Sequence, residues 1–112
     1  GIVTCLTAEG KAEAKLVGRA FKILDVKVGA VLSSPSCRAR QTSYHAFGTE
    51  GKIVNSLLHR TSVMQVQHED FSRDLREKIM SINIEPGENA ILSGHVGTLN
   101  YEEKLCHFSS DL

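Results

Sequence analysis

A strand that runs into a helix through a Ser-Pro break constrains this chain more than any other feature. The segment 31–42 begins with apolar, β-favouring residues, breaks at Ser34 and Pro35, and continues as a helix with Arg38 and Arg40 in its first turns. A buried strand that ends at a helix N-terminus directs unpaired backbone N–H groups and the positive end of the helix dipole at one point. The guanidinium of Arg38 adds donors that suit two oxygens of a phosphate. These residues predict an anion site at the carboxyl edge of a sheet.

Helix-forming and strand-forming segments alternate along the rest of the chain. Apolar spacing and end signals predict helices over about residues 8–24, 36–47 and 69–82, with a last helix after residues 95–99. The expected strands cover residues 28–33 and 89–94, with a brief strand at 53–54. The two longer strands lack polar alternation, which indicates burial on both faces. The alternation predicts a three-layer α/β sandwich in which a mainly parallel sheet is flanked by helices.

The first helix has the pattern of an amphipathic helix. Thr7 precedes it and is expected to cap its N-terminus. Val17, Ala20, Phe21 and Leu24 recur at helical spacing. We expect these four side chains to form the apolar stripe of the helix.

Composition limits the classes of partner and the domain count. The 112 residues predict a single domain over residues 1–112, and thirteen basic residues balance thirteen acidic ones. This balance gives no electrostatic reason to expect a nucleic acid or an anionic membrane as partner. No apolar run approaches the roughly 18 to 20 residues that span a bilayer. The chain begins at Gly1 without a methionine and closes without a clear final element, so we expect truncation at the N-terminus, and the C-terminus is open to the same interpretation.

The number and spacing of the cysteines predict their redox state. Cys5, Cys37 and Cys106 are odd in number and widely spaced, which favours reduced thiols over a disulfide framework. Reduced thiols in turn favour a cytoplasmic location. Cys37 is not expected to act as the nucleophile of a cysteine phosphatase, because the Cys-x5-Arg spacing would require an arginine where Ser43 stands.

Two strand ends carry polar groups suited to phosphate. Ser34 and Arg38 follow the strand at 28–33, and His95 follows the strand at 89–94. Ligand sites in open α/β sheets form beyond the carboxyl ends of strands, so we expect these residues to converge. Ser34 is equally suited to cap the following helix. Arg40 lies two positions after Arg38, points away from it on a helix, and is expected to form a structural salt bridge.

Three motifs resemble those of one family. Residues 33–42, Ser-Ser-Pro-Ser-Cys-Arg-Ala-Arg-Gln-Thr, match the Ser-Ser-Pro-x-x-Arg-Ala-x-Gln-Thr signature of the histidine phosphatase (phosphoglycerate-mutase-like) superfamily. Residues 6–14 resemble the Leu-Thr-x-x-Gly-x-x-Gln-Ala opening of the family's first helix, with Glu13 replacing the glutamine. Residues 92–95, Leu-Ser-Gly-His, resemble its second-histidine segment. The motifs stand in family order over nearly the whole chain, and the short connections resemble the small phosphohistidine-phosphatase-type branch.

The resemblance implies hydrolysis of a phosphate monoester or a protein phosphohistidine through a phosphohistidine intermediate. Arg38 would clamp the phosphoryl group, and His95 would stabilise the charge that develops on it. Arginines and histidines supply the charge stabilisation, so no metal or organic cofactor is expected. The expected partner is a phosphorylated small molecule or a phosphoprotein.

Two of the family's functional groups have no clear counterpart. The nucleophile is a histidine in an Arg-His-Gly-type motif before the Leu-Thr helix, and residues 1–5 contain neither histidine nor arginine. The candidates for a general acid are His59 and Glu69, neither of which lies in a motif. A zinc site is not expected, because the histidines share no metal-ligand spacing.

Whether the chain is an enzyme therefore stays open. The alternative is a non-catalytic phosphate-binding or interaction module on the same fold. The fold would then lack its usual first strand, which is expected to uncover the middle of the sheet and to favour a homodimer through an exposed sheet edge. A third hypothesis is a degraded gene product without a selected function.

Overall fold

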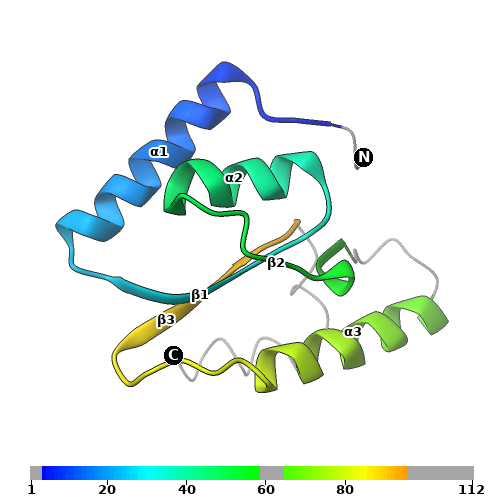
Figure 1. Cartoon of the computed structure of the whole chain (residues 1–112). Coiled ribbons are helices and arrows are strands. Elements are labelled where there is room, and N and C mark those ends of the chain that lie inside the picture. The colour runs from blue at the N-terminus through cyan, green and yellow to red at the C-terminus, as the bar shows by residue number, and fades with distance from the viewer. Residues whose placement is uncertain (1–3, 59–64, 96–112) are drawn as a thin grey trace.

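The computed structural model describes residues 4–58 and 65–95, with the side chains of residues 65–72 left out. Its elements, in chain order, are α1 (Ala8–Ile23), β1 (Lys27–Ser33), α2 (Cys37–Phe47), β2 (Lys52–Ile53), the 3-10 helix η1 (Asn55–Leu58), α3 (Gln65–Met80) and β3 (Glu88–Ser93). α1 and α2 lie on one face of the sheet and α3 lies on the other (Figure 1). The predicted α/β class is confirmed.

The described sheet has three parallel strands in the order β2-β1-β3. Ser33 at the end of β1 is in register with Ile53 of β2 and with Ser93 of β3. All three strands therefore end at one edge, from which the chain continues into α2 after β1. The expectation that the middle of the sheet would be uncovered is wrong for the described strands, because the middle strand β1 pairs on both sides.

The helix ends follow local signals closely. The hydroxyl of Thr7 accepts the Gly10 N–H at 3.1 Å and caps α1, as predicted. α2 ends at Gly48, whose φ of 80° is the left-handed conformation that glycine adopts most easily. α3 begins and ends earlier than predicted, and the Ser81 hydroxyl donates to the Lys78 carbonyl just after its last turn.

The hydrophobic core includes residues of β1, of the segment after β2 and of α3. Its buried members are Leu32, Val54, Leu57 and Leu75, and partly buried side chains of β1, β3 and the end of α3 pack against them. Leu57 and Leu75 are each 1% exposed. The carboxyl half of β1 is thus anchored to α3.

The prediction that both long strands are covered on both faces is wrong. In β1 only Leu32 and Ser33 are buried, and most of β3 is half-buried. α1 packs mainly on α2 rather than on the strands, and β3 is an edge strand among the described ones. The amino half of β1 and the residues of β3 are therefore less buried than continuous apolar runs suggested.

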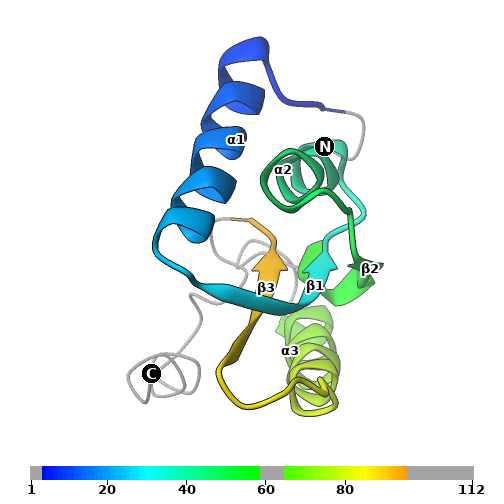
Figure 2. The same ribbon diagram turned by 60° about the vertical axis from the view of Figure 1, so that its left-hand side comes forward.

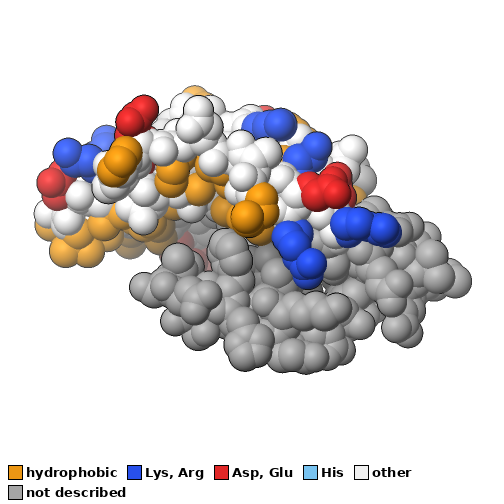
Figure 3. All heavy atoms as spheres, turned by 90° about the horizontal axis from the view of Figure 1, so that it is seen from below, with side chains coloured by type: hydrophobic (Ala, Val, Ile, Leu, Met, Phe, Trp, Pro, Cys, Tyr) orange, Lys and Arg blue, Asp and Glu red, His pale blue; other side chains and the backbone are white. Residues whose placement is uncertain are grey.

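The predicted apolar stripe of α1 is also wrong. Val17 is 48% exposed and Leu24 is 72% exposed, whereas Ala14 and Gly18 are buried. A Cβ atom on Gly18 would lie 1.9 Å from the carbonyl oxygen of Ala46, so α1 approaches α2 through its smallest residues. Figure 3 shows apolar side chains gathered at the end of the molecule where α1 ends.

Substituting Gly18 tests this close approach. In Gly18→Ala the new methyl group forces the two helices apart, and we expect the free energy of unfolding to fall by about 1–3 kcal/mol. This loss occurs even though alanine favours helix by up to roughly 1 kcal/mol relative to glycine. Urea denaturation followed by circular dichroism measures it.

The control is Gly10→Ala in the same helix. The nearest atom to a Cβ there would be the end of the flexible Leu6 side chain at 3.2 Å, and Leu6 Cβ and Thr7 Oγ1 would lie at ordinary van der Waals distance, each 3.5 Å away. We expect the stability to change little or to rise. Equal unfolding midpoints for the two variants would contradict the helix contact.

Candidate functional site

The candidate site lies where β1 and β3 end and α2 begins. The Ser34 N–H donates to the Ser93 carbonyl at 2.8 Å, which extends the pairing of the two strands by one residue. The Ser93 hydroxyl donates to the Ala39 carbonyl at 2.9 Å, and this bond ties the end of β3 to the first turn of α2. The carboxyl edge therefore joins all three elements that carry the predicted site residues.

Ser34 and His95 are in direct contact at this edge. The Ser34 hydroxyl oxygen lies 2.9 Å from Nε2 of His95, although the two residues are 61 positions apart. Ser34 is fully buried and His95 is half-buried. The predicted convergence of the two strand ends thus brings these two residues together.

The roles expected for Ser34 need correction. The N-cap of α2 is Ser36, whose hydroxyl accepts the Ala39 N–H at 3.2 Å. The Ser34 hydroxyl instead accepts the Ser36 N–H at 3.2 Å, in addition to its contact with His95. Because Ser34 has no exposed surface, its hydroxyl is not presented to a phosphate in this structure.

Arg38 presents an exposed cation in the first turn of α2. It lies one residue before Ala39, which contacts the end of β3. Within the described residues its guanidinium makes no ion pair and no hydrogen bond, and only its backbone groups are engaged. No described residue therefore engages any of the five guanidinium N–H donors, which could bind an anion.

Arg40 differs from Arg38 in having protein partners. Its Nη1 lies 3.7 Å from Oε2 of Glu50, and its Nε donates to the Pro35 carbonyl at 3.1 Å. The predicted structural salt bridge of Arg40 is confirmed. The two arginines stand on one helix with contrasting environments, which makes Arg40 a matched control for Arg38.

The backbone of α2 contributes less to an anion site than predicted. The Arg38 N–H donates to the Thr4 carbonyl at 3.0 Å, and the Ala39 N–H is taken by the cap. The segment before α1 lies against this helix, since the Leu6 N–H also donates to the Gln41 side chain at 2.8 Å. The expectation of unpaired N–H groups is wrong for these two, so the Arg38 side chain carries most of the anion-binding potential.

A disulfide between Cys5 and Cys37 holds the segment before α1 against α2. Their Cα atoms lie 4.8 Å apart and their sequence separation is 32. The prediction of reduced thiols is therefore wrong for both residues, and the argument for a cytoplasmic location that rested on it no longer holds. No sequence signal pairs the two, because their proximity depends on the packing of the Thr4–Leu6 segment against α2.

The remaining candidates are not placed by the structure. His59 lies outside the described residues, and the side chain of Glu69 in α3 is not described. No group of three metal-ligating side chains occurs in the parts of the chain that the structure describes. Over the same parts, no helix is both long and apolar enough to cross a bilayer.

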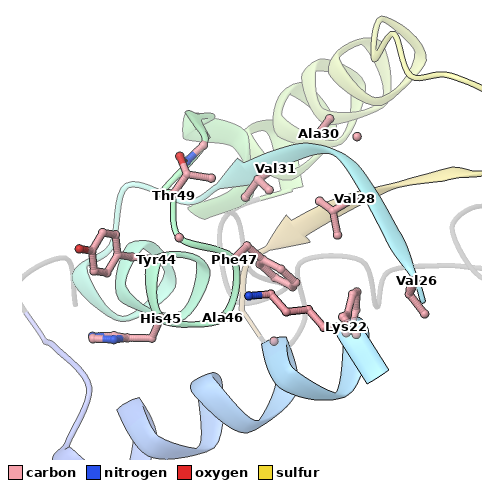
Figure 4. A pocket seen from close by; sticks show the side chains of 15 residues that line it. Lys22, Val26, Val28, Ala30, Val31, Tyr44, His45, Ala46, Phe47 and Thr49 are labelled. Carbon is pink, nitrogen blue, oxygen red and sulfur yellow. The ribbon is translucent and has the colours of Figure 1, made fainter. Parts of the chain in front are cut away.

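A separate pocket of about 670 Å³ opens between the ends of α1 and α2 and the strand β1. In Figure 4 the Lys22 side chain extends along this pocket towards Phe47. Phe47 also forms an edge-to-face pair with Phe21, with ring centroids 5.1 Å apart. The lining contains none of the predicted phosphate-site residues, so this pocket is distinct from the carboxyl edge.

No protein-family model, curated protein or solved structure matches this chain. Membership of the histidine phosphatase superfamily stays a prediction from the three sequence motifs.

Proposed function

We propose that this domain binds a phosphoryl group at the carboxyl edge, with Arg38 as the principal cation and His95 as a second donor. The observation that carries the proposal is the exposed Arg38 side chain, whose guanidinium has no partner among the described residues and which lies in the turn of α2 that Ser93 joins to the end of β3. A guanidinium binds two phosphate oxygens in one plane. Phosphate therefore suits this edge better than an uncharged ligand.

The three motifs give the proposal its substrate class. Their resemblance to histidine phosphatases favours a phosphate monoester or a protein phosphohistidine, carried by a small molecule or a phosphoprotein. Arg38 would hold the phosphoryl oxygens, and His95 would stabilise the negative charge that grows on them as the bond to the leaving group breaks. These side chains supply the positive charge, so the proposal requires no metal or organic cofactor.

Catalysis by the family's route would need one more group. In a chain that carried an Arg-His pair before Leu6, that histidine would attack phosphorus, the leaving group would depart with its electron pair, and water would then hydrolyse the N–P bond. Residues 1–5 of this 112-residue chain contain neither residue type. We therefore expect these 112 residues by themselves to bind phosphate without turnover by this phosphohistidine route.

Substituting Arg38 tests the proposed site. Arg38→Ala removes charge-assisted hydrogen bonds of about 1.5–3 kcal/mol, so we expect the affinity for inorganic phosphate to fall roughly ten- to hundredfold. Two-dimensional 1H–15N NMR titration of the full chain measures the dissociation constant.

Arg40→Ala is the matched control, because it removes the same charge from the same helix. Its guanidinium is already engaged by Glu50 and Pro35, so we expect the phosphate affinity to change less than about threefold, as for a screened surface charge. Equal losses in the two variants, or no phosphate binding by the unsubstituted chain, would contradict the proposed function.

The second candidate is an interaction module that self-associates through the outer edge of β3. Of the described strands, β3 pairs with β1 alone and no described strand occupies its other side, where the backbone N–H and C=O groups of an edge strand could pair with another chain. In Figure 2, α1 lies above the β3 side of the sheet, and its exposed apolar residues include Ile23 and Leu24. We propose a second copy as the occupant, because a two-fold axis can pair two identical strand edges in antiparallel fashion.

This candidate predicts a dimer whose stability depends on the apolar surface of α1. Sedimentation velocity should show the dimer for the unsubstituted chain and a shift to monomer for the double variant Ile23→Glu, Leu24→Glu. Met80→Glu is the control, because Met80 is 74% exposed and lies on α3, across the sheet. A monomeric unsubstituted chain would overturn the interaction module.

A further inference from the structure

We propose that Ser34 is a positioning residue that fixes the ring of His95 with Nε2 as a hydrogen-bond acceptor. The neutral imidazole then carries its proton on Nδ1. This inference deepens the proposed phosphoryl site, and it rests on that site only for the assignment of His95 as a donor to the ligand. The hydrogen bonding of Ser34 and His95 stands independently of any ligand.

The partners of the Ser34 hydroxyl determine the direction of the bond. A hydroxyl has one proton to donate and two lone pairs to accept. The Ser36 N–H uses one lone pair at 3.2 Å, and among the described residues the only other partner of the hydroxyl is Nε2 of His95 at 2.9 Å. The Ser34 proton therefore has one acceptor, and that acceptor is an unprotonated Nε2.

The opposite arrangement is disfavoured by burial. If Nε2 carried the proton, it would donate to Ser34, and the Ser34 O–H would have to point at no acceptor. Ser34 is 0% exposed, so water does not replace that acceptor. An unsatisfied buried donor costs about 1–3 kcal/mol, which is enough to select one tautomer of the neutral ring.

The backbone around Ser34 makes the hydroxyl a rigid anchor. The Ser34 N–H is bonded to the Ser93 carbonyl, and His95 follows Ser93 by two residues. On the other side, the preceding Ser33 carbonyl accepts the Val54 N–H at 2.8 Å. The hydrogen bond between the Ser34 hydroxyl and Nε2 of His95 thus joins two strand ends whose backbones are already paired, and it fixes the imidazole relative to the start of α2.

The selected tautomer matches the role proposed for His95. A phosphoryl oxygen is an acceptor, so it needs a donor, and Nδ1–H is the donor of a ring whose Nε2 is engaged by Ser34. Without the Ser34 hydroxyl the ring would lose the hydrogen-bond donor that selects this tautomer. We therefore assign Ser34 an effect on the phosphate affinity that acts through His95 rather than through direct contact.

The test reads the protonation of each ring nitrogen directly. In the full chain labelled with 15N-histidine, long-range 1H–15N correlation NMR above the titration range of the imidazole distinguishes protonated from unprotonated nitrogens. Comparison with His95→Gln assigns the His95 signals. We expect an unprotonated Nε2 and a protonated Nδ1 in the unsubstituted chain, and a protonated Nε2 there would overturn the proposal without any variant.

The variants separate positioning from general structure. In Ser34→Ala we expect His95 to lose its preference for Nδ1–H and the phosphate affinity to fall roughly two- to tenfold, as for the loss of one hydrogen bond. Ser33→Ala is the matched control, because Ser33 is equally buried but its hydroxyl bonds Ser43 and the Glu50 carbonyl instead. We expect the His95 tautomer to be unchanged in Ser33→Ala, and the same change in both variants would overturn the assignment.

Failure of this inference is distinguishable from failure of the phosphoryl site. If the tautomer is as expected but phosphate does not bind, Ser34 positions His95 while the proposed function is wrong. If phosphate binds through Arg38 but the tautomer of His95 is unchanged in Ser34→Ala, the proposed function stands and the positioning role is overturned.

Discussion

The parallel pairing of β1 with β3 is the interaction on which the rest of the described structure depends. It ends with Ser33 opposite Ser93, and the Ser34 N–H extends it by one bond to the Ser93 carbonyl. Bringing β1 and β3 together closes a long loop, which is entropically unfavourable. The backbone hydrogen bonds along the paired strands must together offset that loss of entropy. The same pairing places His95 beside Ser34 and ties α2 to the sheet through Ser93.

On the α2 side, hydroxyl groups join this end of the sheet to the helix, whereas apolar side chains anchor it to α3 on the other face. Ser33 bonds Ser43 of α2 and the Glu50 carbonyl, each at 2.6 Å, while Ser36 caps the helix. Five serines are buried in the described residues, and only the hydroxyl of Ser56 among them has no hydrogen-bond partner there. Buried hydroxyls are costly unless they are paired, so a paired network permits few alternative arrangements. Such a network suits a site in which an imidazole must keep one orientation.

Local signals predicted local structure well, because caps and helix-forming patterns act within a few residues. The cap at Thr7 followed from its place before the helical pattern of α1, and the structural role of Arg40 followed from its spacing to Arg38 on α2. The predictions that failed concern which elements meet. Gly18 offers no hydrophobic signal, yet it sets the distance between α1 and α2, and the pairing of Cys5 with Cys37 depends on packing that no periodicity encodes. The strand-end rule predicted the meeting of the two strand ends, but it could not predict that the Thr4 carbonyl would occupy a helix N–H group or that Ser34 would be covered.

We propose the carboxyl edge formed by β1, β3 and the first turn of α2 as the phosphate site. Mapping the backbone amide shifts of the full chain during titration with inorganic phosphate is the most direct test of where phosphate binds. We expect saturable shifts concentrated at residues 34–38 and 93–95, with little change around Lys22 and His45 in the separate pocket. Shifts concentrated at that pocket, or none at any residue, would contradict the proposed site.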